Sequence, residues 1–333
     1  MQVLVLSHDD VKRVLPPDEC ADAMARVLAM RARGEAYNSL RSIMMPTDAA
    51  GFMGLMPGWR ASGDEGKASF ALKAICLIPE NPSRGLDTHQ GIVTLFDGEI
   101  GVPTAILDAS AVTDIRTAAV TAVATRALSR EDARTLTILG AGVQARSHLR
   151  ALLTVRDFQT VRVFAPTADH ARAVLEDAPA VSGSTRMTLA QSAEEAVRGA
   201  DVVVTATSSR TPVLERDWLA PGAHVNAVGA SSPSARELDV ATVVASSLFC
   251  DSRESLAAEA GEYRLALQEG AIDGERHVRG ELGEVLIGER PGRRNDRELT
   301  LFRSLGIAVE DLAAAEHAVR AARRLGLGTE VEL

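Results

Sequence analysis

Three basic residues of the N-terminal part stand among apolar neighbours. They are Arg41 in NSLRSIMMP, Lys73 in FALKAICLI and Arg116 in VTDIRTAAV. A cation in such a setting is costly to bury without a partner, and each one taken alone is typical of a snorkelling side chain or a structural ion pair. Arginine binds carboxylates through paired hydrogen bonds. Beside the nucleotide-binding pattern that follows, the three together therefore predict a clamp for an anionic substrate.

A glycine-rich loop carries the second chemical pattern. The run TLTILGAGVQARSHLRAL begins as an apolar strand, turns at Gly140 and Gly142, and continues as a helix from Val143. Gly140 permits the tight turn, Gly142 lets the backbone approach a pyrophosphate, and Ala145 replaces the third glycine at the helix–strand contact. The helix N-terminus offers free N–H groups to phosphates. A bare GxGxxA is a weak signal, but a strand before it and a helix after it are the context that dinucleotide binding requires.

The next segment, VRVFAPTADHAR, holds the position that chooses between NAD and NADP. This position lies roughly 20 to 25 residues beyond the first glycine, at the tip of the second strand. Here the tip runs from Ala165 to Thr167 and has no acid, which removes repulsion against a 2′-phosphate. Thr167, His170 or Arg172 could contact that phosphate, although Arg172 could equally be a solvated helix residue. We expect NADP(H) as the preferred cofactor, with NAD(H) as the other option.

The elements around the glycine loop alternate between strand and helix. Such alternation predicts a parallel sheet covered by helices on both faces, as in a doubly wound Rossmann domain. A strand-like segment at 299–302 and a helix at 309–324 come last, and we expect this helix to fold back on the N-terminal part. The expected strands are 136–139, 161–164, 202–205, 224–228 and 248–250.

The N-terminal part follows a different pattern. A strand at 3–6 leads to Ser7, which with Asp10 forms a capping-box-like helix start, and an amphipathic helix is expected at 18–33. Short β-type runs separated by turn signals then predict a mostly antiparallel sheet, and a helix at 109–128 could bridge two domains. The expected strands are 39–45, 52–56, 70–78, 92–96 and 104–107, with turns at Pro57-Gly58, Asn81-Pro82 and Asp97-Gly98.

Composition narrows the class of protein. Hydrophobic residues make up 46% of the chain and aromatic residues only 3%, which favours helices packed on buried strands over an aromatic-rich β-sandwich. The formal net charge is −9 and no basic run exceeds two arginines, so we expect no nucleic-acid partner. Charge, Gly or Pro interrupts every long apolar stretch, and the N-terminus does not resemble a signal peptide. We therefore expect no membrane partner.

Cysteine and histidine usage points the same way. The cysteines at 20, 76 and 250 are far apart and lack CxxC spacing, so neither a disulfide framework nor a structural zinc site is expected, and a reducing cytoplasm fits. The seven histidines show no metal-ligand spacing. We expect no metal.

Six ordered blocks make a family resemblance specific. The chain resembles the ornithine cyclodeaminase/mu-crystallin family over nearly its whole length. The resemblance implies a substrate-binding and dimerisation domain at 1–116 with 306–333, a Rossmann domain at 117–305, and a homodimer. The matching blocks are GFMGLMP, ALKAICLIPENPSRGLDTHQGIVTLFD, AILDASAVTDIRTAAVTAVATRAL, LGAGVQARSHL, VGASSPSARELD and SLGIAVEDLAAA.

The resemblance also implies roles for single residues. Arg41 and Lys73 match the residues that clamp the substrate carboxylate, and Arg116 matches an arginine between substrate and cofactor. Thr88 matches a cofactor contact, and Ser304 a late one. The remaining expected cofactor residues are Gly140, Gly142, Val143 and Gln144 in the phosphate loop, Ala165 and Thr167 at the cofactor-choice position, Thr205 and Thr207 at the end of the third strand, and Val228 and Gly229 beneath the nicotinamide.

Two departures from the cyclodeaminase pattern decide the expected substrate. Where true cyclodeaminases have a catalytic aspartate and then a lysine, this chain has Ser231 and Ala235. A hydroxyl cannot serve as a carboxylate base near neutral pH, so ornithine cyclisation is not favoured. The family's NAD-type aspartate is also replaced, by Ala165. The block VGASSPSARELD instead resembles the mu-crystallin and pyrroline-2-carboxylate reductase branch, whose members reduce cyclic ketimino acids.

The predicted reaction is hydride transfer from NAD(P)H to C2 of Δ1-pyrroline-2-carboxylate or Δ1-piperideine-2-carboxylate, which gives L-proline or L-pipecolate. Arg41 and Arg116 would hold the carboxylate, Lys73 would complete the clamp or assist proton transfer, and Ser231 would either bond the ring nitrogen or shape a turn. Two alternatives share the fold: an alanine-type amino-acid dehydrogenase and an ornithine cyclodeaminase. An alternative of another class is an NADP(H)-dependent small-molecule binding protein of mu-crystallin type.

Three further polar residues carry weaker expectations. His89, in THQG, either lines the site or makes a structural hydrogen bond at a strand start. Glu259 and Glu262, in EAGEY, are expected to cap a helix, with contact to the site as the alternative.

Overall fold

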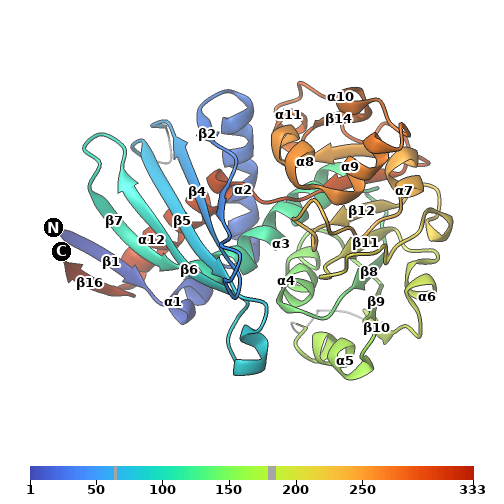
Figure 1. Ribbon diagram of the computed structural model, residues 1–333, viewed down its shortest axis with the longest axis horizontal. Coiled ribbons are helices and arrows are strands. Elements are labelled where there is room, and N and C mark those ends of the chain that lie inside the picture. The colour runs from blue at the N-terminus through green and yellow to red at the C-terminus, as the bar shows by residue number, and fades with distance from the viewer. Residues whose placement is uncertain (64–65, 179–184) are drawn as a thin grey trace. The chain divides into compact units, whose positions relative to one another are not determined.

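The computed structural model describes residues 1–63, 66–178 and 185–333. The chain divides into two compact units, one made of Met1–Arg116 with Gly306–Leu333 and the other of Thr117–Leu305 (Figure 1). Helix α3 (Ala109–Leu128) carries the chain from the first unit into the second. Within the described ranges, no helix combines the length and apolar character needed to cross a membrane.

The first unit is built on one mostly antiparallel sheet, as its short strands predict. Its order is β16-β1-β7-β6-β5-β4-β2, with β3 also paired to β4; β1 and β7 are parallel and the other pairs antiparallel. The strands are β1 (Gln2–Leu6), β2 (Ala36–Asn38), β3 (Ser42–Met44), β4 (Phe52–Arg60), β5 (Ser69–Leu77), β6 (His89–Asp97), β7 (Pro103–Asp108) and β16 (Thr329–Glu332).

The first helix of this unit begins at the cap that the sequence predicts. Ser7 and Asp10 form a capping box at α1 (His8–Val14), and α2 (Pro17–Ala32) follows, with the short η1 (Asn81–Arg84) later in the chain. The last helix, α12 (Ala308–Leu325), contacts α2, β4, β5 and β6 (Figure 1). The C-terminal helix therefore completes the core of the N-terminal unit, as expected.

The predicted turn at Pro57-Gly58 is wrong, because both residues lie inside the long strand β4. On one side of β4, β2 pairs with 58–60 and β3 with 53–55, so Pro57 has no partner there. A residue without an N–H is tolerated where the ladder is interrupted. A Cβ on Gly58 would lie 3.1 Å from the backbone of Ala308, so the glycine lets the start of α12 approach the sheet closely.

The second unit contains one fully parallel sheet, in the order β10-β9-β8-β11-β12-β15-β13-β14. The two edge strands, β10 and β14, escaped prediction because their sequences, RMTL and VRGE, lack the continuous apolar runs of the buried central strands. The strands are β8 (Thr135–Leu139), β9 (Thr160–Phe164), β10 (Arg186–Leu189), β11 (Val202–Thr205), β12 (His224–Ala227), β13 (Ser247–Cys250), β14 (Val278–Glu281) and β15 (Thr300–Arg303).

Helical segments connect these strands (Figure 1). Because all the strands are parallel, their carboxyl ends lie along the same end of the sheet. Strands β11, β12 and β15 are buried along their whole lengths. This is the Rossmann-type α/β fold that the alternation predicts. The helices are α4 (Val143–Leu152), α5 (Ala168–Glu176), α6 (Ala193–Val197), α7 (Val240–Ala245), α8 (Arg253–Glu259), α9 (Gly261–Gln268), α10 (Gly274–His277) and α11 (Leu282–Leu286), with η2 (Arg216–Trp218) between β11 and β12.

Candidate active site

A buried ion cluster lies on the α12 side of the sheet in the first unit. Lys73, in the middle of β5, is 2% exposed, and its Nζ donates to Oδ1 of Asp311 at 3.0 Å. The Nε of Arg116 donates to the same oxygen at 2.9 Å, and its guanidinium also donates to Glu310 at 2.8 Å. One aspartate of α12 thus binds two of the three predicted substrate cations.

The start of α12 is shaped to admit these charges. Glu310 and Asp311 lie in its first turn, where carboxylates complement the helix dipole. Gly306 precedes the helix with φ of +76°, and a Cβ there would lie 2.7 Å from the Arg116 guanidinium. Glycine is therefore required for both conformation and space.

Arg41 joins the same region from the break between β2 and β3. The sequence predicts one continuous strand at 39–45, and this prediction is wrong. Residues 39–41 instead separate two short strands, β2 and β3. The guanidinium of Arg41 donates to the carbonyl of Gly306 at 2.9 Å. The three predicted clamp residues therefore gather around the segment that opens α12.

Electrostatics favour an anion beside this cluster. Burial lowers the pKa of Lys73 to about 8, although the Asp311 charge opposes that shift. Burial works to raise the pKa of Asp311, but the charges of Arg116 and Lys73 outweigh it and hold this pKa below its ordinary value. Arg41, Lys73 and Arg116 therefore bring three basic side chains to one place, where the carboxylate of a substrate could bind.

His89 belongs to the surroundings of this cluster. It opens β6, and burial together with the charges of Lys73, Arg116 and Arg41 lowers its pKa to about 4. Its imidazole is therefore neutral near neutral pH and can accept or donate a hydrogen bond without adding charge. Thr88, just before it, uses its carbonyl to accept from the backbone N–H of Ile78 at 3.0 Å.

The glycine loop of the second unit has the geometry that a dinucleotide requires. Gly140 has φ of +129°, and a Cβ there would lie 2.3 Å from the carbonyl oxygen of Ala206. Gly142 is the N-cap of α4, has no side chain to bond the first N–H groups, and faces no described atom within 4 Å of an added Cβ. The N-terminus of α4 therefore keeps free donors and room for a phosphate.

Two buried oxygens near the expected cofactor contacts have no hydrogen-bond partner among the described residues. They are Oε1 of Gln144, in the first turn of α4, and Oγ of Ser304, directly after β15. Buried polar atoms are rarely left unpaired in a native protein, so a bound molecule is a natural partner for both. The loop and these atoms together fit NAD(H) or NADP(H).

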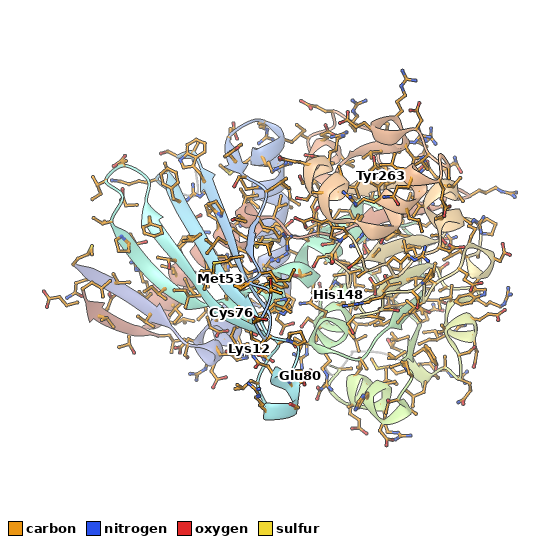
Figure 2. The ribbon with its side chains drawn as sticks, viewed as in Figure 1. Lys12, Met53, Cys76, Glu80, His148 and Tyr263 are labelled. Carbon is orange, nitrogen blue, oxygen red and sulfur yellow. The ribbon has the colours of Figure 1, made fainter. Side chains whose placement is uncertain are left out.

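His148, a residue of α4 itself (Figure 2), links this helix to α3 through hydrogen bonds. It is fully buried, its Nδ1 lies 2.7 Å from the carbonyl of Gln144, and its Nε2 lies 3.0 Å from Oγ1 of Thr121. Burial lowers its pKa to about 4, so the ring is a neutral hydrogen-bonding strut.

A buried carboxylate, Glu237, organises the ends of β11 and β12. It accepts from Oγ1 of Thr205 at 2.9 Å, from the N–H and Oγ1 of Thr207 at 2.6 and 2.7 Å, and from the N–H of Gly229 at 2.7 Å. Burial raises its pKa above the ordinary value, although these hydrogen bonds oppose the shift. A Cβ on Gly229 would lie 2.1 Å from the carbonyl oxygen of Thr207, so the two strand ends touch here. Val228, just before Gly229, is 8% exposed.

Sequence reasoning missed Glu237. Its only signal is an acid placed directly before an apolar residue in the block ARELD. Thr205 and Thr207 were predicted as cofactor contacts, and the structure shows that their hydroxyls already donate to Glu237. Their remaining acceptor capacity and nearby backbone are what a cofactor could use.

The capping role expected for Glu259 and Glu262 is wrong. Ser252 caps α8, and α9 has no side-chain cap. Glu262 is buried and pairs with the buried Arg303, whose guanidinium donates to the carbonyls of Ala227, at the end of β12, and of Ala230, in the loop that follows. Glu259 is the last residue of α8 and is also buried. An unpaired buried arginine destabilises a fold strongly, so Glu262 serves as the ion-pair partner of Arg303 and does not cap a helix.

Four predicted positions lie in more open surroundings. Ala165 and Thr167 follow β9, and Thr167 is the N-cap of α5 without a side-chain cap bond. Arg172 pairs with Asp169 at 2.5 Å. Ser231 lies exposed in the loop after β12. Within the described ranges, no three His, Cys, Asp or Glu side chains gather as a metal site would need.

Comparison with known proteins agrees with this arrangement. A Delta(1)-pyrroline-2-carboxylate reductase of Bacillus cereus is 32% identical over 331 residues, 99% of this chain and 100% of the relative. The ketimine reductase mu-crystallin of Mus musculus is 37% identical over 303 residues, 91% and 90% of the two chains. The solved structure of Thermococcus litoralis Delta(1)-pyrroline-2-carboxylate reductase in complex with NADH and L-proline has a TM-score of 0.92 at 35% identity and covers 99% of this chain and 100% of that chain. The model of the ornithine cyclodeaminase/mu-crystallin family matches residues 1–323, and this chain belongs to that family.

Proposed function

We propose that this protein is an NAD(P)H-dependent oxidoreductase that reduces a cyclic ketimino acid, Δ1-pyrroline-2-carboxylate or Δ1-piperideine-2-carboxylate, to L-proline or L-pipecolate. The observation that carries the proposal is the cluster of Arg41, Lys73 and Arg116 around the start of α12. A substrate with a carboxylate beside its imine suits such a cluster. Relatives with reductase names cover nearly the whole chain.

The mechanism assigns each charged group a task. Arg41, the most open of the three, binds the substrate carboxylate, and Arg116 supports it from a position set by Glu310 and Asp311. Bound NAD(P)H supplies the hydride that adds to C2 of the protonated imine. Lys73, with a pKa of about 8, can hold or pass a proton at the ring nitrogen near neutral pH. The enzyme mainly orients an electrophile that is already reactive.

The cofactor residues proposed in the second unit divide into two sets. Gly140, Gly142, Val143 and Gln144 would hold the pyrophosphate at α4, and the remaining contacts would come from Thr205, Thr207, Val228, Gly229 and Ser304. We keep Thr88 and Arg116 as contacts from the first unit. A preference for NADP(H) is supported by the missing acid at Ala165–Thr167. Comparing kcat/KM for NADPH and NADH tests it, and a higher value with NADH would contradict it.

A homodimer is supported by an exposed apolar patch on the sheet of the first unit. Strand pairing places Leu55 and Ile92 opposite Ala74 on one face, together with Phe70 and Tyr37. Tyr37 is 67% exposed and Phe70 47%, which is unusual for a face that stays in water. Light scattering at micromolar concentration should give twice the chain mass. The three free cysteines support a cytoplasmic location, which fractionation of the source cells would test.

The function is tested by following oxidation of NADPH and NADH with each cyclic imine, with pyruvate plus ammonia as a control. Fast turnover of a cyclic imine supports the proposal and ranks the two ring sizes. Turnover only with pyruvate and ammonia would indicate an alanine-type dehydrogenase instead. Saturable NADPH binding without turnover of any of these substrates would indicate a binding protein.

A further inference from the structure

An arginine-rich pocket lies in the second unit, away from every residue assigned above. Its volume is about 570 Å³. It is lined by the residues that open β13 and by His277 and Leu299, which directly precede β14 and β15. The pocket therefore sits at the amino ends of these parallel strands. The proposed dinucleotide residues follow the carboxyl ends of β8, β11 and β12, at the opposite edge of the same sheet.

The lining concentrates positive charge in a chain whose net charge is −9. Five arginines and one glutamate contribute to it. The arginines come from η2, from α10, from β14 and from the loop before β15. No single basic run in the sequence therefore predicts that they lie together. Positive charges gathered at one place repel one another, and a bound anion would relieve that repulsion.

The acidic residue in the lining, Glu298, already has hydrogen-bond partners. Glu298 accepts from Oγ of Ser247 at 2.6 Å and from the backbone N–H and side chain of Arg294. Burial works to raise the pKa of Glu298, but these bonds outweigh it and hold the pKa below its ordinary value, so the carboxylate stays ionised and matched.

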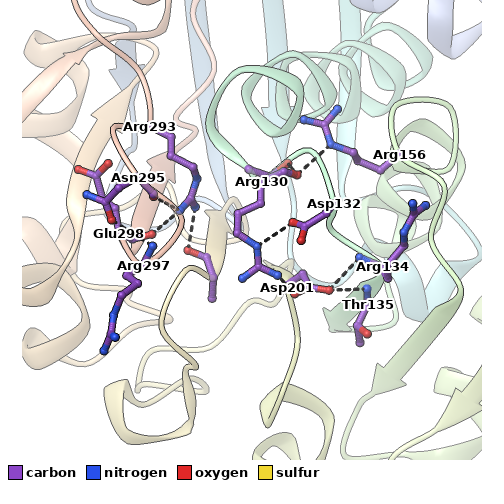
Figure 3. A network of polar contacts seen from close by, with 12 residues as sticks. Arg130, Asp132, Arg134, Thr135, Arg156, Asp201, Arg293, Asn295, Arg297 and Glu298 are labelled. Atoms are coloured by element: carbon purple, nitrogen blue, oxygen red, sulfur yellow. Dashed lines mark hydrogen bonds and ion pairs between the residues drawn. The ribbon is translucent and has the colours of Figure 1, made fainter.

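The other arginines differ in how far they are engaged. Arg276 pairs with Asp273 at 3.2 Å, and Arg216 donates to the carbonyl of Leu219 at 3.1 Å. Among the residues that the structure describes, no hydrogen bond or ion pair joins the guanidinium of Arg279 or of Arg297. Figure 3 shows Arg297 extending away from the neighbouring network, in which Arg293 is tied to backbone and side-chain oxygens.

We propose that this pocket binds a small phosphate anion of the diphosphate or triphosphate type. Guanidinium groups pair with phosphate oxygens through two parallel bonds, and Arg279 and Arg297 are available for this. The volume lies within the range of small-ligand sites. The lining contains no Phe, Tyr or Trp on which a nucleobase could stack, so the recognised group is the phosphate chain itself.

The test is isothermal titration of the purified full-length protein with inorganic pyrophosphate, in the presence of saturating NAD+ so that the glycine loop is filled. We expect saturable binding that the variant R279Q/R297Q weakens about tenfold or more, because two charge-assisted contacts are lost. The matched control R323Q/R324Q removes the same charge from the exposed end of α12 and should bind pyrophosphate like the wild type.

Each other outcome overturns the proposal. No binding at millimolar pyrophosphate would show that the arginines are only a solvated surface. Binding that NAD+ abolishes and R279Q/R297Q leaves unchanged would place pyrophosphate in the glycine loop. Equal weakening in both double variants would show a general charge effect. Because both arginines are exposed, thermal unfolding of the variant without ligand should match the wild type, and the pyrophosphate-induced rise in Tm should be lost with the binding.

Discussion

Replacing Asp311 with asparagine removes the charge on which the buried cluster depends. Its Oδ1 lies 3.0 Å from Nζ of Lys73 and 2.9 Å from Nε of Arg116. At an effective dielectric constant of about 20, a unit charge pair at this distance attracts by roughly 5 kcal/mol. Asparagine has the same size and still accepts one hydrogen bond. We therefore expect a net loss near the low end of what breaking a buried ion pair costs, about 3 kcal/mol of the free energy of unfolding.

The same change should shift the pH dependence of catalysis. The pKa of Lys73 is about 8 while Asp311 opposes the effect of burial, and without that charge it falls further. If protonated Lys73 serves the reaction, the wild-type rate declines as pH rises through about 8, and the decline in D311N begins at lower pH. At pH 8 a fall of one pKa unit lowers the protonated fraction of Lys73 from about one half to about one tenth, so the variant should be roughly fivefold slower or more.

The assay is the initial rate of imine reduction across neutral and alkaline pH, with urea unfolding of the same samples. Asp9→Asn is the matched control, because Asp9 is an exposed carboxylate on α1 and should change stability by less than about 0.5 kcal/mol. An unchanged pH profile together with an unchanged unfolding midpoint in D311N would refute the reasoning. NADH binding should persist in D311N, which separates loss of the cluster from global misfolding.

Three further predictions concern single positions. Glu237→Gln replaces one carboxylate oxygen with an NH2 group, which then faces the N–H of either Thr207 or Gly229. We therefore expect roughly a tenfold higher Kd for NADH by fluorescence titration, with about 1–3 kcal/mol lost in unfolding; an unaltered Kd would contradict a positioning role. Gly140→Ala places a Cβ 2.3 Å from a carbonyl oxygen at φ of +129°, so it should lower stability by about 2–4 kcal/mol and abolish cofactor binding, whereas wild-type behaviour would show that the loop relaxes freely. Lys73 has a pKa lowered from 10.5 to about 8, so the unfolded chain binds more protons between these values and the free energy of unfolding should rise with pH there, by about 3 kcal/mol relative to Lys73→Met; parallel curves for the two proteins would exclude this.

Local patterns were sufficient wherever the relevant interaction lies within a few residues. The capping box at Ser7, the glycine turn at Gly140 and the long helix at 109–128 are all found where the sequence predicts them. The same local reasoning failed at Pro57 and Gly58, which lie inside a strand instead of a turn. Pro57 is tolerated because the strand pairing beside it is interrupted, and Gly58 is needed because the start of α12 approaches it closely.

The sequence by itself determined the α/β class, the glycine loop and the family, and it singled out the three cations of the proposed clamp. These depend on periodicity, on glycine placement and on residue types that stand out against apolar neighbours. Only the tertiary structure decided which acids hold those cations. Asp311 is 238 residues from Lys73, Glu237 is about 30 residues from the threonines it binds, and the pocket arginines come from four separate segments. A buried charge is stabilised by whatever folding brings within about 3 Å, and no local pattern specifies that partner.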